Sequence, residues 1–263
     1  MLWFDRLLDT RMPRPAPWGL YHIAWFVAAL LFAFALRSQN DEKATRRIFA
    51  VFGWVAFALE ALTQLSWGLS PDASGRLVWD YEWYAAPFQL CTTPIFVCIL
   101  YPAFKSERVR AALRAYLAYF TFTGSLAVAA IPDTIYTQEV LINLHTAFLH
   151  LGALSVSLWL LIHGRAGRAD FWGGYAVFLL FTGLALALDV LVYHVAPLGG
   201  ETFNMFFISP YFVSTLPVFG TIWRTAPYPV FLLCYLVAFT LGGLIVLGAQ
   251  QAALAVKSRL CRA

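Results

Sequence analysis

A cysteine stands between two prolines in an apolar stretch that begins at Trp83 and reads WYAAPFQLCTTPIFVC. Pro87 and Pro94 each remove a backbone hydrogen-bond donor beside Cys91, so a helix here is expected to kink next to the thiol. At such a kink the thiol can reach a cavity, and its thiolate is a nucleophile when a histidine takes the proton. The alternative interpretation is a small buried thiol that packs beside the kink.

Two histidines in the apolar segment NLHTAFLH are the candidates for this base. His145 and His150 are separated by about 500° of helix rotation, so they point about 140° away from each other. We expect one to face a cavity and the other to face a neighbouring helix or the lipid headgroups. Counted along the predicted spans, His150 lies at nearly the depth of Cys91, which makes it the better general base. A histidine that is satisfied by a backbone or hydroxyl partner is the alternative.

Other polar side chains also interrupt the apolar segments. Ionisable and amide groups are unfavourable in hydrocarbon, so they are expected to face the interior of a helix bundle. Counted at about 1.5 Å per residue from the outer ends of the predicted spans, they all fall in the outer half of the membrane. They predict one polar pocket around Cys91 that opens outward or toward the outer leaflet, with the supporting residues Glu60, Gln64, Gln89, His145 and Asp189.

The two carboxyl groups in this set, Glu60 and Asp189, have several possible roles. They could orient a histidine, carry a proton, or join helices through hydrogen bonds. A metal site shared with the histidines is a weak alternative, because neither HxxxH nor ExxH spacing occurs on one helix. We therefore expect neither a metal nor a cofactor.

The elements that must position these residues follow from composition. The chain has 263 residues, of which 61% are hydrophobic and 12% charged, which excludes a water-soluble fold. A bilayer core about 30 Å thick needs roughly 20 apolar residues in a helix. Charge-free runs predict an all-α integral membrane protein with seven transmembrane helices, at 18–36, 48–69, 83–104, 111–131, 140–162, 171–195 and 229–247.

The whole chain is predicted to be a single transmembrane domain. Residues 1–17 form an interfacial segment, 18–247 a seven-helix bundle in which 196–228 is interfacial or re-entrant, and 248–263 a cytoplasmic tail. Five of the 18 Lys and Arg residues fall in one set of alternate loops and the others in the opposite set. The positive-inside rule then places the N-terminus outside and the C-terminus inside. We expect a multi-pass protein of the cell membrane, the inner membrane of a bacterium.

Some function classes can be excluded. The three lysines, Lys43, Lys105 and Lys257, all lie outside the predicted spans, so no retinal Schiff base can form. The chain has no GxxxxGK loop, which excludes an ATP-driven pump. The net charge of +4 is explained by membrane orientation, so no nucleic-acid partner is expected.

Several motifs resemble the YwaF-type integral membrane proteins of bacteria and their eukaryotic relative, a transmembrane acyltransferase that acts on phospholipids. The matching pieces are APFQLC at 86–91, AIPD at 130–133, FLHLGALSVSLW at 148–159, ETFNMFF at 201–207 and TAPYPVFLL at 225–233. The resemblance implies a seven-helix fold and a catalytic cysteine and histidine, which fall on Cys91 and His150. Gln89 departs from the bacterial pattern, which usually has a histidine there.

The expected function is lipid acyl transfer within the membrane through a Cys91 thioester, with His150 as general base. Phospholipid and lysophospholipid are the expected substrates, and membrane lipids the expected partners. Hydrogen bonds to the oxyanion could come from Gln89, Asn204 or the hydroxyl groups of Thr92 and Thr93.

The alternative function is a binding or transport protein without covalent chemistry. Glu60, His150 and Asp189 would then line a path for a small solute or a proton, and Cys91 would be incidental. The two prolines would mark a broken helix at the binding site.

Overall fold

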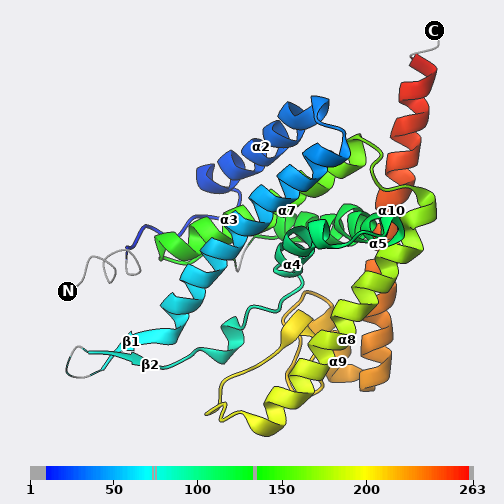
Figure 1. The fold of residues 1–263 in the computed structure, drawn as a ribbon. Helices are drawn as coiled ribbons and strands as arrows, with labels where there is room; N and C mark the ends of the chain where they lie inside the picture. Colours follow the sequence, from blue (N-terminus) through cyan, green and yellow to red (C-terminus); the bar gives the residue numbers. More distant parts are fainter. Residues whose placement is uncertain (1–9, 73, 75, 133–134, 261–263) are drawn as a thin grey trace.

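The computed structural model describes residues 10–72, 74, 76–132 and 135–260. Helices dominate these residues (Figure 1). Five helical segments in the described part of the chain are long and apolar enough to cross a membrane. They contain α2 (Leu20–Ala35), α3 (Glu42–Gly68), α7 (Val140–Ile162), α8 (Phe171–Val195) and α10 (Tyr228–Leu260).

The outer surface of these helices is apolar. Large side chains such as Leu20, Leu31, Leu180, Leu233 and Ile245 are each at least 60% exposed. Water would penalise so many exposed apolar groups, whereas lipid chains would not. The prediction of a helical membrane protein is confirmed at this level.

The predicted third span is not one kinked helix, and this expectation was wrong. A 3-10 turn at Trp83–Ala85 is followed by non-helical chain to Thr92, then by α4 (Thr93–Leu100) and a further turn at Tyr101–Ala103. Pro94 lies in the first turn of α4, where its missing N–H leaves no bond unmade. It therefore begins a helix and does not kink one, so Cys91 lies in non-helical chain.

The predicted fourth span is a helical run with a π-helical segment inside it. It consists of α5 (Glu107–Ala115), the π-helical Tyr116–Thr121 (η4) and α6 (Phe122–Ala130). Every residue of η4 is buried. α5 begins before the predicted boundary because charged residues do not end a helix.

The predicted second span also begins earlier than expected. α3 begins at Glu42, where the side chain of Asp41 accepts a hydrogen bond from Ala44 N at 2.6 Å.

The segment 196–228, predicted to be interfacial or re-entrant, is largely irregular. It holds a 3-10 turn at Met205–Phe207 (η6) and the short helix α9 (Phe219–Thr225), and η6 packs against α8. A second irregular connection follows α3 and contains the antiparallel hairpin of β1 (Leu69–Pro71) and β2 (Leu77–Trp79).

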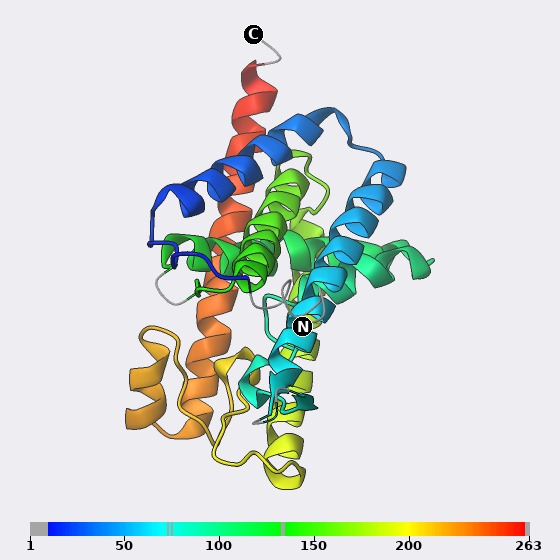
Figure 2. The same cartoon turned by 90° about the vertical axis from the view of Figure 1, so that its left-hand side faces the viewer.

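Both ends of the chain are described in part. Residues 1–9 of the interfacial segment and 261–263 of the tail lie outside the described residues. Met12 N donates to Gln138 O at 2.8 Å, so the chain before α2 pairs with the chain before α7. The predicted tail is not separate, because α10 continues to Leu260 and projects beyond the other helices (Figures 1 and 2).

An aromatic core joins α3, α4, η4, α7, α8 and α10. At its centre Phe120 of η4 stacks on Phe178 of α8, with ring centroids 5.1 Å apart. The close approach of α8 to the fourth helical run depends on Gly174. A Cβ atom there would lie 2.7 Å from Tyr116 N and 2.8 Å from the carbonyl carbon of Ala115.

Replacing Gly174 by Ala is therefore expected to destabilise the protein. The new methyl group would meet backbone atoms that cannot move aside, and overpacking of this kind costs about 1 to 3 kcal/mol. The measurement is thermal unfolding of the purified protein in detergent. Gly183→Ala is the matched control, since a Cβ atom at this position of α8 would meet nothing within 4 Å. Equal melting temperatures of the two variants would contradict this packing account.

Candidate functional site

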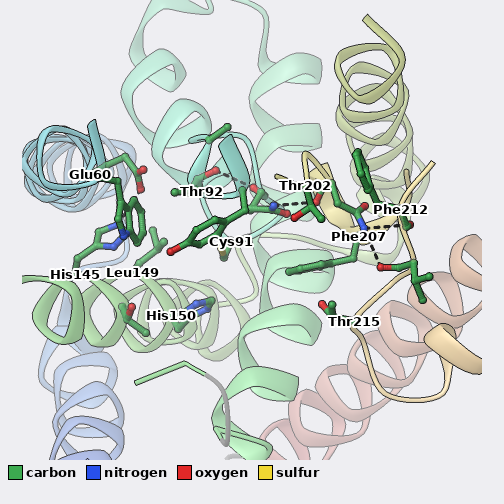
Figure 3. A pocket seen from close by; sticks show the side chains of 18 of the residues that line it. Glu60, Cys91, Thr92, His145, Leu149, His150, Thr202, Phe207, Phe212 and Thr215 are labelled. Atoms are coloured by element: carbon green, nitrogen blue, oxygen red, sulfur yellow. Dashed lines mark hydrogen bonds and ion pairs between the residues drawn. The ribbon is translucent and has the colours of Figure 1, made fainter. Parts of the chain in front are cut away.

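A cavity of about 710 Å³ brings most of the predicted site residues together (Figure 3). Its walls come from α3, α7, the non-helical chain before α4 and the irregular chain around η6. The predicted residues on the wall are Glu60, Gln89, Cys91, Thr92, His145, His150 and Asn204. Gln64 and Asp189 were expected there as well, but neither borders the cavity.

Cys91 occupies a turn immediately before α4. The amides of Thr92 and Thr93 donate to Gln89 O at 3.0 and 3.3 Å, which closes this turn. The amides of Leu90 and Cys91 donate no hydrogen bond to another described residue, and that of Cys91 lies close to its own sulfur. Because a helix N-terminus carries a partial positive charge, negative charge that develops near Cys91 is stabilised there.

Glu60 and His145 form a pair between α3 and α7. Glu60 Oε2 lies 2.8 Å from His145 Nε2, and both side chains are buried. The contact is close in distance, but its angle is not that of a regular hydrogen bond. Gln64 lies behind the pair, where its amide donates to Glu60 Oε1 at 2.8 Å and its oxygen accepts from the hydroxyl of Tyr81 at 2.5 Å. Gln64 therefore positions Glu60 and does not line the cavity.

Both histidines border the cavity, although we expected one of them to face away from it. The cavity is wide enough along α7 to reach both, and His145 also faces the neighbouring helix α3 through Glu60. Neither ring nitrogen of His150 makes a hydrogen bond to a described residue. Its Nδ1 is fully buried, whereas Nε2 keeps some access. Both ring nitrogens of His145 are fully buried, so His150 is the one of the two histidines with an accessible nitrogen that can accept a proton.

The four side chains predicted as oxyanion donors are already engaged in hydrogen bonds. Thr92 donates to Gln89 O at 2.9 Å, and Thr93 donates to Leu90 O at 2.7 Å. The amide of Asn204 donates to Val213 O at 3.2 Å. Gln89 donates one amide hydrogen to Asn204 O at 3.0 Å and accepts from Phe206 N at 2.8 Å. These side chains hold the cavity wall together.

Asp189 supports an unusual backbone conformation in η6. Phe206 and Phe207 have φ values of 55° and 59°, in the left-handed region that non-glycine residues rarely adopt. Met205 N donates to Asp189 Oδ1 at 2.7 Å, next to the bond between Gln89 and Phe206 N. Asp189 is fully buried and positions this loop, whose Phe207 side chain borders the cavity.

Several residues of the site could not be found from the sequence. Trp67, Tyr84, Thr202, Phe207 and Phe212 border the cavity. They are aromatic or hydroxyl side chains in loops or at a helix end. Because aromatic residues are frequent along the whole chain, the sequence did not distinguish these from the others. Among the described residues, no group of three His, Cys, Asp or Glu side chains could hold a metal ion.

Comparison with known proteins gives one result. The sequence model of the TMEM164 family matches residues 16–247, which include all the helices of the described residues except the last turns of α10. No curated protein and no solved structure matches the chain.

Proposed function

The chain belongs to the TMEM164 family, and from the geometry of its cavity we propose that it transfers acyl chains between membrane lipids through a thioester on Cys91. One observation carries this proposal. Cys91 shares a largely apolar cavity with His150, whose ring nitrogens make no hydrogen bond to a described residue. The helices around this cavity have outer surfaces that are compatible with lipid. A volume of about 710 Å³ is in the range of cavities that bind small organic ligands.

In the first half of the proposed reaction, His150 Nε2 takes the thiol proton of Cys91. The thiolate sulfur attacks the ester carbonyl carbon of a phospholipid, and the C–O bond to glycerol breaks. His150 returns the proton to the departing alkoxide, which leaves as a lysophospholipid. The acyl chain is then held on Cys91 as a thioester.

In the second half, the hydroxyl group of another lysophospholipid attacks the thioester. His150 takes the hydroxyl proton and passes it to the sulfur as the C–S bond breaks. A new phospholipid and the free thiol result. Acyl transfer is favoured over hydrolysis in this cavity because apolar walls limit access of water.

The oxyanion of each step would be stabilised by backbone amides and by the side-chain amide of Gln89. Because Thr92, Thr93 and Asn204 use their donors within the wall, the amides of Leu90 and Cys91 and the second amide hydrogen of Gln89 remain available. They lie beside the nucleophile at the N-terminus of α4, where a developing negative charge is also favoured by the helix.

The same proposal includes the membrane topology. The chain would cross the membrane seven times, with 83–104 crossing as non-helical chain followed by α4, and with 107–130 as the fourth crossing. The N-terminus would be outside and the C-terminus inside, in the inner membrane of a bacterium. The resemblance to YwaF-type proteins and to the eukaryotic phospholipid acyltransferase supports this assignment of residues and substrates.

The test uses the purified protein in vesicles that contain a phospholipid with a labelled acyl chain and an unlabelled lysophospholipid. We expect label to appear in phospholipid newly formed from the lysophospholipid, as measured by lipid mass spectrometry. Label that stays entirely in the original phospholipid would contradict the proposal.

The transport alternative requires that Glu60, His150 and Asp189 line one continuous path. Glu60 and His150 border the cavity, but Asp189 is bonded to the η6 backbone and does not border it. A continuous path lined by all three side chains is therefore not supported by these contacts. In a transporter, substitution of Glu60 would impair function more than substitution of Cys91.

A further inference from the structure

A second cavity lies near the other ends of α3 and α7. It has a volume of about 420 Å³, and its wall consists of Glu42, Glu107, Arg110, Arg114, Gly164 and Arg165. Glu42 begins α3, whereas Glu60 of the first cavity lies about 27 Å further along that helix at 1.5 Å per residue. Gly164 and Arg165 follow the end of α7, whereas His145 and His150 lie in its first half. The two cavities are therefore separate.

The wall of the second cavity carries three arginines and two glutamates, so it has one excess positive charge. Arg114 is buried, and it donates to Glu107 Oε1 at 2.5 Å, to the hydroxyl of Tyr101 at 2.6 Å and to the carbonyl oxygen of Arg165 at 2.9 Å.

The second arginine of this wall is matched in the same way. Arg110 Nη2 lies 2.6 Å from Glu107 Oε2, and its Nη1 lies 3.4 Å from Glu42 Oε1. Glu42 also accepts from Arg46 Nε at 3.1 Å and pairs with Arg165, so two carboxylates are shared among four arginines. The third arginine of the wall, Arg165, therefore has no carboxylate of its own.

Arg165 is the arginine whose donors are least used. Its Nη2 donates to Thr45 Oγ1 at 2.9 Å and lies 3.7 Å from Glu42 Oε2. Its Nε is buried and has no hydrogen-bond partner among the described residues. Its Nη1 also makes no hydrogen bond to a described residue and is not fully buried, so it can donate to a ligand that brings acceptor oxygens.

We propose that the second cavity binds a phosphate group, with Arg165 as its principal ligand. Guanidinium groups present their donors in a planar fork that matches phosphate oxygens, and they stay charged at any physiological pH. A volume of about 420 Å³ also leaves room for a group esterified to the phosphate. The phosphate would belong either to a lipid headgroup, as in basic pockets between membrane helices, or to a soluble molecule. This site is independent of the acyl-transfer proposal.

The experiment measures thermal unfolding of the delipidated protein in a maltoside detergent. One arm adds inorganic phosphate and the other phosphatidylglycerol, each against chloride at matched ionic strength. At a concentration about 100 times the Kd, binding is expected to raise the Tm by roughly 5 °C. Arg165→Gln should remove this rise. Arg259→Gln, the same charge change on the exposed end of α10, should leave it intact.

The two arms also separate the sources of the phosphate. A rise in both arms would show that the phosphate group alone is sufficient, and a rise with phosphatidylglycerol alone would assign the site to a lipid headgroup. No rise in either arm, or the same rise in Arg165→Gln, would overturn the proposal and leave a purely internal ion-pair network. If Arg165→Gln does not fold, Arg165→Lys serves instead, because it keeps the charge but loses the fork and should give a smaller rise.

Discussion

Replacing Cys91 by Ala is expected to abolish acyl transfer, with kcat/KM lower by at least about 10³-fold. The loss should be this large because the substitution removes the sulfur on which the thioester forms, and among the described cysteines only Cys91 borders the cavity. The fold should survive, since Cys91 is only partly buried and lies in a turn. The measurement is transfer of a labelled acyl chain from phospholipid to lysophospholipid in vesicles.

Cys98→Ala is the matched control for this experiment. Cys98 lies on α4 only seven residues away, but it is fully buried in the core and does not border the cavity. Its substitution should leave kcat/KM nearly unchanged. Equal activity of the Cys91 and Cys98 variants would remove Cys91 from the mechanism.

The second large effect is expected for His150. Loss of a general base reduces rates by about 10²- to 10⁴-fold, so His150→Gln should fall in this range. His145→Gln should cost less than about tenfold, because Nε2 of His145 faces Glu60 and not a free space. The measurement is the same acyl-transfer assay, with thermal unfolding as the check on folding.

Glu60→Gln distinguishes between His150 and His145 as the general base. If His150 is the base, Glu60→Gln should resemble His145→Gln and lose only a small part of the acyl-transfer activity. If His145→Gln and Glu60→Gln both match the loss of His150→Gln and their effects are not additive, then His145 is the base and Glu60 orients it. A Glu60 effect that exceeds the Cys91 effect would favour the transport alternative.

The helices could be predicted wherever a long run is free of charge and proline. The ranges 140–162 and 171–195 were predicted from the sequence and are those of α7 and α8. The run around Cys91 could not be predicted in this way, because Pro94 is compatible with either a kink or the start of a helix. The extension of α10 to Leu260 was also missed, since good helix formers such as Gln250 and Ala253 continue the helix outside the apolar run.

The candidate site was predicted in its residue types but not in its contacts. Polar side chains in apolar runs indicated Cys91 and both histidines, and the cavity gathers them. The sequence carries no signal for bonds between distant segments, such as that from Gln89 to the chain 115 residues later. Those bonds depend on the left-handed backbone of Phe206, which no local pattern of residues predicts.

The most direct test of the central claim is the intact mass of the detergent-purified protein after incubation with a defined phospholipid and no lysophospholipid. Without an acceptor, the thioester should accumulate. We expect a mass increase equal to one acyl chain, removed by hydroxylamine and absent from Cys91→Ala. No acyl adduct on the wild-type protein, or the same adduct on Cys91→Ala, would contradict catalysis through Cys91.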